Sequence, residues 1–524
     1  MKAPIVMHAN ASGKTGSGQR PGSRGRAARR VSIRAVLAGA SMIMSLGACT
    51  LGPDYARPKV EVPANFRFAD TEMSAVADAA WWEQFNDPVL NDLIATALAN
   101  NKDVKIAAAR VDQYRAQFVQ TRSQFFPQVS AGFDAQRQRL DQTQAALLPR
   151  GASPVGNAFD ATLGVSWEID LFGRIRRETE AARASVLSSV EGRRATILAL
   201  VASVASGYVN LRALDAQLEI AKETTASRAD SVHVFTLRFN GGEISQMELA
   251  QSQSEYEASA ATVPQIEAQI AQQEDALSVL LGRNPGPIAR GRSIDALNAP
   301  VLPAGLPSDL LERRPDVLGA EQDLVAANAL IGAARALYFP QISLTGVLGT
   351  ESAQLSNLFT GPTKFWSLAG SVAQPIFTAG NITGQVRQAE AQQQQALYTY
   401  EKTVQTAFQE VDDTLIGVQK SREQLASQSR QVDALTTYAH MARMRYEGGY
   451  TSYIEVLDAE RSLFSAQLSV AQTHSLVLTS LVTLYKAMGG GWVIEAEAKA
   501  DAAAQTDAGT ALPASAAQGS SSSP

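Results

Sequence analysis

The chain carries one turn-forming stretch twice, as Arg238-Phe239-Asn240-Gly241-Gly242-Glu243-Ile244-Ser245-Gln246-Met247-Glu248 and, 207 residues later, as Arg445-Tyr446-Glu447-Gly448-Gly449-Tyr450-Thr451-Ser452-Tyr453-Ile454-Glu455. Glycine tolerates positive φ, so a Gly-Gly pair ends a helix where a residue with a Cβ would be strained. Ser245 and Ser452 each precede a glutamate by three residues, which predicts a capping box at the start of a returning helix. Two helical-hairpin tips are therefore expected, at 239–247 and 446–454.

Long amphipathic segments on both sides of each turn keep the same offset. Before the turns, apolar residues recur at alternating spacings of four and three, which predicts packed helices; they are Ile197, Val201, Val204, Tyr208 and Leu211, matched by Val404, Phe408, Val411, Leu415 and Val418. Each helix leading to a tip is predicted to span about 66 residues, or roughly 100 Å. Pro264 is expected to kink or break the first returning helix. Internal duplication of this extent predicts one architecture used twice.

Shorter segments between the helices alternate polar and apolar residues, as strands do. They lie at 128–138 and 159–170 in the first repeat and at 341–349 and 366–376 in the second. Strands of about ten residues suit a membrane-spanning barrel. Four strands cannot close a barrel and lipid does not tolerate open edges, so we expect three chains to supply twelve strands. A soluble four-stranded sheet is the alternative interpretation of this pattern.

The only cysteine, Cys49, excludes a disulfide within the chain. It follows a basic stretch, an apolar segment over 35–44 and the sequence Leu46-Gly47-Ala48. This arrangement resembles a bacterial lipoprotein signal, which implies that Cys49 becomes the lipidated first residue, carrying an N-acyl group and an S-diacylglycerol. An ordinary secretory signal and a buried free cysteine are the alternatives.

Composition argues against several classes of protein. Residues 1–48 contain eight basic residues and no acid, so the rest of the chain has 38 basic against 51 acidic residues, a formal charge of −13. Such a balance disfavours nucleic-acid binding, which requires a cationic surface. We find no phosphate-binding loop, no metal-ligand spacing and no nucleophile motif, so neither an enzyme nor a metal site is expected.

The expected organisation has six parts. A lipoprotein signal peptide (1–48) and an anchored strap (49–85) precede repeat 1 (86–282), a proline-rich linker (283–308), repeat 2 (309–491) and a tail expected to be disordered (492–524).

Together these features resemble the outer-membrane channel component of tripartite efflux pumps, in the lipidated branch partnered with resistance-nodulation-division pumps. The resemblance covers about residues 49–492 and rests also on Trp81-Trp82 with Asp87-Pro88, the Phe-Pro-Gln elements at 126–128 and 339–341, Leu171-Phe172-Gly173 with Ile376-Phe377, Thr378-Ala379-Gly380, and Gly489-Gly490-Gly491-Trp492. It implies a homotrimer of mixed α and transmembrane β structure. A 12-stranded barrel in the outer membrane would be continued by a long periplasmic α-helical barrel, with no cofactor besides the lipid.

The resemblance also implies the functional residues. The tips would contact a periplasmic adaptor protein through Gly241, Gly242, Glu243, Ile244 and Ser245 and through Gly448, Gly449, Tyr450, Thr451 and Ser452. Tyr446, Glu455 and Asp458 would form the periplasmic gate, with Glu248 as the equivalent in the first hairpin. Where relatives can carry a basic gate residue this chain has Thr451, which puts a salt bridge between subunits in question.

Physical chemistry independently draws attention to the acids of the second tip. Glu455 and Asp458 are three residues apart and share a helix face. A three-fold axis would then gather six carboxylates, a ring that favours cations. The alternative is that acids in the first turn of a helix compensate its dipole.

Two other functions fit parts of the pattern. An exit duct of a type I-like secretion system shares the architecture, whereas a lipid-anchored coiled-coil spacer would have no need of strands. The sequence does not specify the cargo, the adaptor or the pump. His233 and His440 are also 207 residues apart, which fits either a pH-sensing ring or a coincidence on helix surface.

Overall fold

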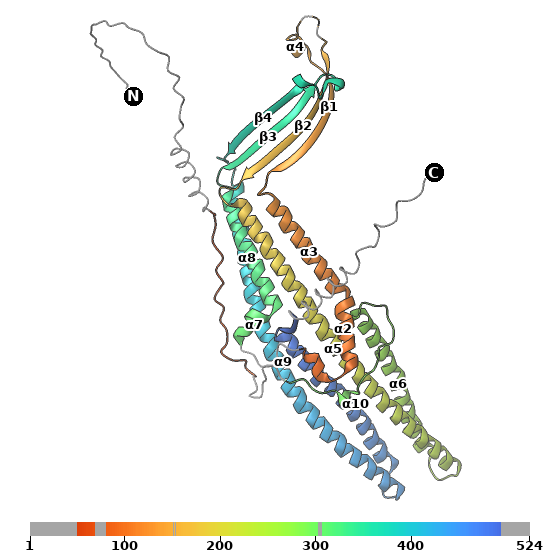
Figure 1. Cartoon of the computed structure of the whole chain (residues 1–524). Coiled ribbons are helices and arrows are strands. Elements are labelled where there is room, and N and C mark those ends of the chain that lie inside the picture. Colours follow the sequence, from red (N-terminus) through yellow and green to blue (C-terminus); the bar gives the residue numbers. More distant parts are fainter. Residues whose placement is uncertain (1–49, 69–79, 150, 152, 302–306, 494–524) are drawn as a thin grey trace, which may run out of the picture. The chain divides into compact units, whose positions relative to one another are not determined.

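The computed structural model describes residues 50–68, 80–149, 151, 153–301 and 307–493 (Figure 1). The predicted signal peptide, Cys49 and the chain from residue 494 onward lie outside the described residues. Within them the elements follow one another as two repeats, each with short helices, two strands and a long helical hairpin. This is the mixed α and β fold that the sequence predicts.

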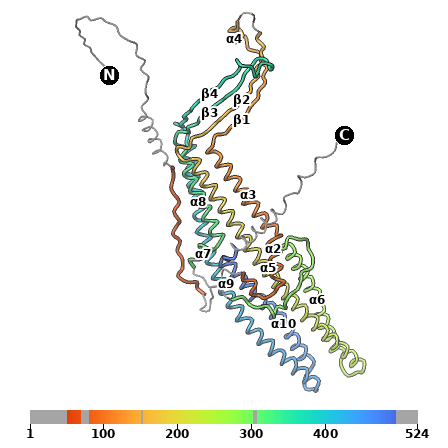
Figure 2. Tube along the Cα trace, viewed as in Figure 1, coloured from red at the N-terminus to blue at the C-terminus, as the bar shows by residue number. Residues whose placement is uncertain are grey.

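Each hairpin consists of one very long and one shorter helix. The first contains α5 (Arg174–Asn240) and α6 (Gln246–Leu280), and the second contains α9 (Asn381–Glu447) and α10 (Tyr453–Ala487). Both α5 and α9 have 67 residues, and both α6 and α10 have 35. A helix of 67 residues extends for about 100 Å, and Figure 2 traces each hairpin to its own tip. Each helix of the second hairpin therefore begins and ends 207 residues after its counterpart in the first hairpin.

The expected break at Pro264 is wrong, because α6 continues through this residue. A proline inside a helix removes one backbone hydrogen bond and crowds the preceding turn. However, α6 packs along α5, and these contacts hold the helix together despite the local cost.

Shorter helices lead into the strands. In the first repeat they are η1 (Trp81–Phe85), α2 (Pro88–Asn100) and α3 (Lys102–Ser123), and in the second α7 (Pro307–Arg313) and α8 (Pro315–Ala336). The helices α3 and α8 are equivalent, since both have 22 residues and both reach a strand through a Phe-Pro-Gln element. Loops hold the one-turn segments α4 (Gln142–Ala145), η2 (Ile294–Ala296), η3 (Leu355–Asn357) and η4 (Gly361–Thr363).

One antiparallel sheet joins the two repeats in the order β1-β2-β3-β4. Its strands are β1 (Gln128–Arg139), β2 (Val155–Ile169), β3 (Gln341–Ser352) and β4 (Lys364–Ala373). Three predicted boundaries need correction. The strand β3 continues to Ser352 instead of ending at 349, since Ser352 still pairs with Phe159 of β2. The strand β2 begins at Val155 instead of 159, since it pairs with the end of β1. The strand β4 ends at Ala373 instead of 376, because Pro375 cannot donate to a strand ladder.

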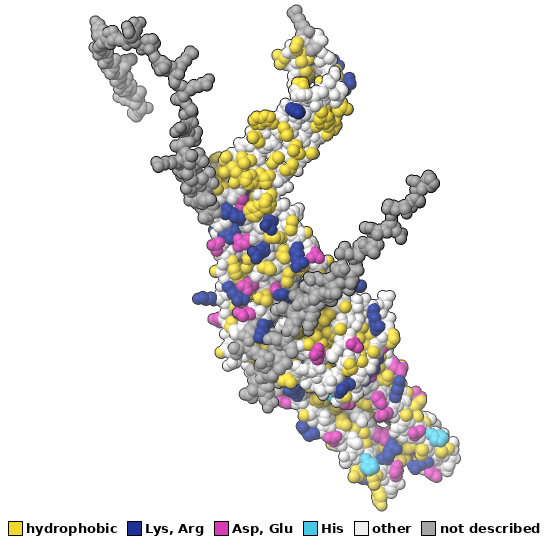
Figure 3. Space-filling model, viewed as in Figure 1, with side chains coloured by type: hydrophobic (Ala, Val, Ile, Leu, Met, Phe, Trp, Pro, Cys, Tyr) yellow, Lys and Arg dark blue, Asp and Glu magenta, His cyan; other side chains and the backbone are white. Residues whose placement is uncertain are grey.

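The two faces of the sheet differ in polarity. The register aligns Val129, Val165, Gly346 and Leu368 in one row, and Leu163, Leu348 and Trp366 in the next. The opposite face carries polar rows, among them Asp134, Asp160 and Glu351. On the face drawn in Figure 3, hydrophobic side chains cover much of the strands, whereas charged side chains are more frequent on the helices. This distribution suits a sheet with one face in lipid and the other toward water.

The central core forms where α2, α5, α10 and the inter-repeat linker meet. Trp81 stacks on Tyr485 with ring centroids 5.2 Å apart, and Trp82 meets Trp492 edge to face. Trp492 and Val493 are each 2% exposed. The predicted disordered tail therefore does not begin at 492, because these two residues complete the core.

Asp87 fastens the linker to this core. Its carboxylate is fully buried and accepts hydrogen bonds from the Tyr208 hydroxyl at 2.8 Å and from the backbone amide of Arg292 at 2.9 Å. It also caps α2 through the amide of Val89. Gly291 passes so close that a Cβ there would lie 2.2 Å from the carboxylate. The Asp-Pro motif thus holds three segments that are distant in sequence.

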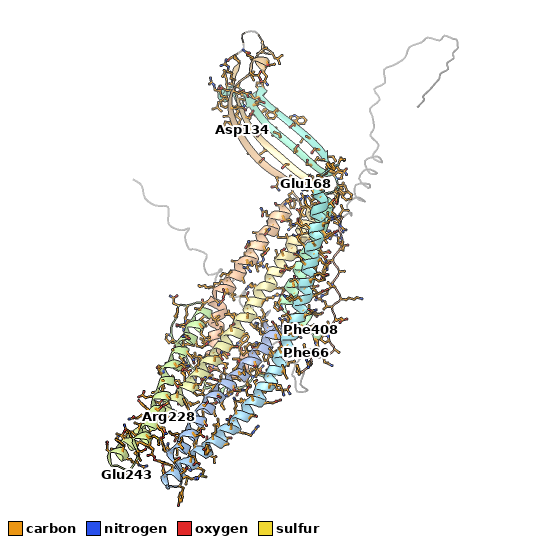
Figure 4. All side chains as sticks on the ribbon, turned by 180° about the vertical axis from the view of Figure 1, so that it is seen from behind. Phe66, Asp134, Glu168, Arg228, Glu243 and Phe408 are labelled. Atoms are coloured by element: carbon orange, nitrogen blue, oxygen red, sulfur yellow. The ribbon has the colours of Figure 1, made fainter. Side chains whose placement is uncertain are left out.

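The strap runs along the helices (Figure 1). Arg177 on α5 donates to the carbonyl of Leu51 and to Asp54, and Asn328 on α8 donates to the carbonyl of Pro53. Further along, Phe66 is buried near Phe408 in a cluster with residues of α9 and α10 (Figure 4). The strap is therefore part of the packed fold over residues 50–68.

Candidate functional site

The two tips close with the same backbone geometry. Gly242 and Gly449 adopt φ of +79° and +77°, values that favour glycine. The amide of Glu243 donates to the carbonyl of Arg238, and the amide of Tyr450 donates to that of Arg445. Only the second glycine of each pair needs the positive φ, since Gly241 and Gly448 remain in the helical region.

The first tip contains the predicted capping box. The Ser245 hydroxyl accepts from the amide of Glu248, and the Glu248 carboxylate accepts from the amide of Ser245 at 2.9 Å. The Glu248 carboxylate is thus used to cap the start of its own helix, α6. The pKa of Tyr446 on the second hairpin is raised by burial and, second, by the negative charge of Glu248.

The predicted capping box at the second tip is wrong, because the Ser452 side chain makes no cap hydrogen bond. Glu455 turns instead toward the Thr451 hydroxyl and toward Arg445, whose guanidinium lies 3.0 Å away. The basic partner of this gate candidate therefore comes from its own hairpin. Asp458 is exposed. Its charge makes only a small contribution to the raised pKa of Arg461, which is due chiefly to the hydrogen bond from Arg461 to Glu255.

Tyr446 belongs to an aromatic cluster that joins the hairpins. Phe235 on α5 lies 4.2 Å from the ring centroid of Tyr453 and stacks on Tyr446 at 6.1 Å. Phe235 is 5% exposed, and its ring contacts lie across the boundary between hairpins. Burial raises the pKa of both tyrosines. We name the boundary between α5–α6 and α9–α10, from Phe235 up to Arg228, the hairpin seam.

A charged network lies further along the seam. Arg228 on α5 donates to the carbonyl of Glu255 at 2.7 Å, and its guanidinium lies over the ring of Phe464 on α10. Arg461 on α10 also contacts the Glu255 carboxylate. Figure 4 shows Arg228 between the helices, away from Glu243 at the first tip. These four residues were missed in the sequence, although Arg228 stands at a heptad position between Ala221 and Phe235, where a charge signals a specific partner.

Two cavities accompany these contacts. One of about 410 Å³ is lined by Arg228, Phe464 and His440, and one of about 340 Å³ by Phe235, Tyr446 and Tyr453. The first cavity includes His440, but His233 lines neither. Toward the tips the hairpins therefore contact each other around two cavities, whereas nearer the central core α5 and α10 pack closely. This arrangement allows the tip regions to separate while the core stays intact.

The exposed ends of the hairpins carry apolar side chains. Tyr450 is 81% exposed, Met247 is 66% exposed and Ile454 is 62% exposed. Ile244 instead packs against the seam. Exposed apolar residues clustered at one end of a protein indicate a contact surface for a partner.

The sequence model of the family described as "Outer membrane efflux protein" matches residues 93–283 and 306–490. The antibiotic efflux pump outer membrane protein ArpC of Pseudomonas putida is 40% identical over 455 residues, which are 85% of this chain and 93% of that protein. The cation efflux system protein CusC of Escherichia coli is 36% identical over 456 residues, 86% and 97% of the two chains. The open-state crystal structure of the MtrE outer membrane channel of Neisseria gonorrhoeae superposes with a TM-score of 0.76 at 33% identity, covering 85% and 99% of the chains.

Proposed function

Because the chain belongs to the outer membrane efflux protein family, we propose that it works as a homotrimeric duct whose periplasmic gate is the hairpin seam. The chain is the outer-membrane channel of an efflux pump, with its helices in the periplasm, and it is not an enzyme. The gate proposal rests on one observation, the burial of Phe235 against Tyr446 and Tyr453 of the other hairpin.

The sheet supports the trimer. Within the described residues β1 and β4 each pair on one side only, and lipid does not tolerate an unpaired strand edge. Three chains placed edge to edge supply twelve strands, an even number within the range of membrane barrels. The apolar rows would face lipid and the polar rows would line the lumen.

Asp458 is expected to dominate the charge of the pore entrance. It is exposed, whereas Glu455 is partly compensated by Arg445. We therefore expect Asp458→Ala to reduce the cation preference of single channels in planar bilayers more than Glu455→Ala, since carboxylate rings favour cations. Glu243→Ala, which removes an acid of the first tip, is the control. Equal ion selectivity in all four proteins would contradict a gate at the second tip.

The tips are the proposed adaptor surface, formed by residues 241–245 and 448–452. Tyr450 is exposed within the second range, and the exposed Met247 and Ile454 follow closely after the two ranges. Tyr450→Asp is expected to lower co-purification of the periplasmic adaptor several-fold, because a charge would enter an apolar contact. Tyr438→Asp, at a partly exposed tyrosine away from the tip, should retain the adaptor. Equal retention by both variants would exclude Tyr450 from the contact.

The anchor and the pump complete the proposal. We propose that Cys49 carries the N-acyl and S-diacylglycerol lipid, because it ends a lipoprotein-type signal and is followed at once by the docked strap. The inner-membrane partner would be a pump of the resistance-nodulation-division class. The names of the relatives mention antibiotics, toluene and cations, and small toxic compounds of these kinds are the proposed cargo.

A further inference from the structure

The apolar face of the sheet contains a hollow across β2, β3 and β4. Its volume is about 510 Å³, and its walls include Leu163, Trp167, Leu344, Gly346, Trp366 and Leu368. The register explains the depression, because Gly346 lies between Val165 and Leu368 in a row of otherwise large side chains. A Cβ at Gly346 would come within 3.1 Å of Leu368. We name this hollow the sheet groove.

Two tryptophans, Trp167 and Trp366, line the groove, and the polar nitrogen of Trp167 already has a partner. The indole nitrogen of Trp167 donates to the carbonyl of Phe125 at 2.9 Å, so the ring turns only apolar surface to the groove. Pro127, which immediately precedes β1, also lines the groove. Trp167 is two residues from the end of β2, at the side where this strand continues toward α5. The groove therefore reaches the end of the sheet that joins the helices.

The first described residues of the strap are held at this same end. Thr50 packs against Gly173, where a Cβ would lie 3.1 Å from the Thr50 Cα. Gly52 approaches Gly332 so closely that a Cβ would lie 2.4 Å from its Cα. Arg177, whose side chain is 5% exposed, donates to the carbonyl of Leu51 at 3.1 Å and pairs with Asp54. The start of the strap is thus fixed by close backbone packing and by a buried guanidinium.

We infer that the sheet groove binds an acyl chain carried by Cys49, which directly precedes Thr50. This inference rests on the proposed lipidation. The acyl chains leave from the Cys49 amine and sulfur, one residue from Thr50, which is held against Gly173 at the end of the sheet that the groove reaches. Free lipid chains are equally apolar, but a chain whose first atoms are already held loses less freedom when it enters the groove. The groove would then fix the height of the strap relative to the membrane.

Photo-crosslinking of the lipidated full-length protein tests this assignment. Cells are fed a fatty acid bearing a diazirine, and the purified trimer is irradiated, digested with trypsin and analysed by mass spectrometry. We expect the peptide that begins at Cys49 to be joined through its acyl chain to peptide 151–174, 336–364 or 365–387, which contain β2, β3 and β4. Gly346→Phe, which fills the groove, should lower the yield of this product several-fold. Ala131→Phe, on the same face of β1 and outside the groove, should leave it unchanged.

The possible failures differ in what they overturn. Strand peptides carrying phospholipid, without any link to the Cys49 peptide, would show that membrane lipid occupies the groove and would overturn the inference alone. The same holds for an acylated Cys49 peptide joined equally to all four strands. A Cys49 peptide without acyl mass would overturn the lipidation itself, and the inference with it. The native protein gives these answers even if a variant fails to assemble.

Discussion

Phe235→Ala is expected to turn a low or flickering native current into a large and steady one. The Phe235 ring contacts Tyr446 and Tyr453 of the other hairpin, so its burial stabilises only the arrangement in which the hairpins touch. Burying a phenylalanine is worth about 1.5–3 kcal/mol, and every 1.4 kcal/mol is about a factor of ten in an equilibrium. Each chain would shift toward separated hairpins by a factor of about ten or more.

Single-channel recording in planar bilayers measures this effect. Phe239→Ala is the matched control, because Phe239 lies one turn nearer the tip on α5 and is 38% exposed. Arg461→Ala should act in the same direction but more weakly, since Arg461 is 65% exposed and exposed ion pairs contribute about 0.2–1 kcal/mol. Phe235→Ala currents that match those of Phe239→Ala would show that the hairpin seam does not hold the channel closed.

Asp87→Ala is expected to cause a large loss of stability in the central core. Three donors that now bind the buried carboxylate, the Tyr208 hydroxyl and the amides of Val89 and Arg292, would lose their acceptor. One buried unsatisfied polar group costs about 1–3 kcal/mol, so a total near 3 kcal/mol or above is expected even if water reaches one of them.

Two measurements together check this prediction. The helical circular dichroism of Asp87→Ala should be lost at a lower temperature than in the native protein, and trypsin should cleave faster after Arg290 and Arg292 in the released linker. Asp92→Ala, on the exposed face of the same helix, is the control and should behave as native. Native-like melting of Asp87→Ala would mean that the linker is held by its other contacts.

The repeat and its periodicity predicted most of the fold. A stripe of apolar residues with constant spacing is a local property, and so is the glycine pair that ends each long helix. The existence of the strands was also predictable, because alternation of polar and apolar residues over about ten positions is typical of a strand whose two faces meet different surroundings. The expectations that proved wrong involve competition between interactions. Pro264 remains inside a helix because α5 packs along it, and the Ser452 hydroxyl gives up its capping role because Thr451 and Arg445 hold Glu455.

The candidate site was less predictable than the fold. Tyr446 was named from resemblance, and the structure adds two partners. Tyr453 lies seven residues away across the second tip, whereas Phe235 belongs to the other hairpin, far away in sequence. The network of Arg228, Glu255 and Arg461 could not be predicted for the same reason, because it depends on how one hairpin is placed against the other. The gate function of Tyr446, Glu455, Asp458 and Glu248 stays a prediction until channels are recorded.

The equal lengths of the two hairpins have a consequence for stoichiometry. In the proposed trimer, α5 and α9 of every chain begin beside the sheet and both run for 67 residues, so six ends would finish at one level around the axis. A ring-shaped partner would then contact six nearly equivalent binding positions instead of three. Neighbouring binding positions would differ in chemistry, because a first tip presents Glu243 and a second tip presents Tyr450. Six identical partner subunits would therefore bind in two alternating environments, one acidic and one aromatic.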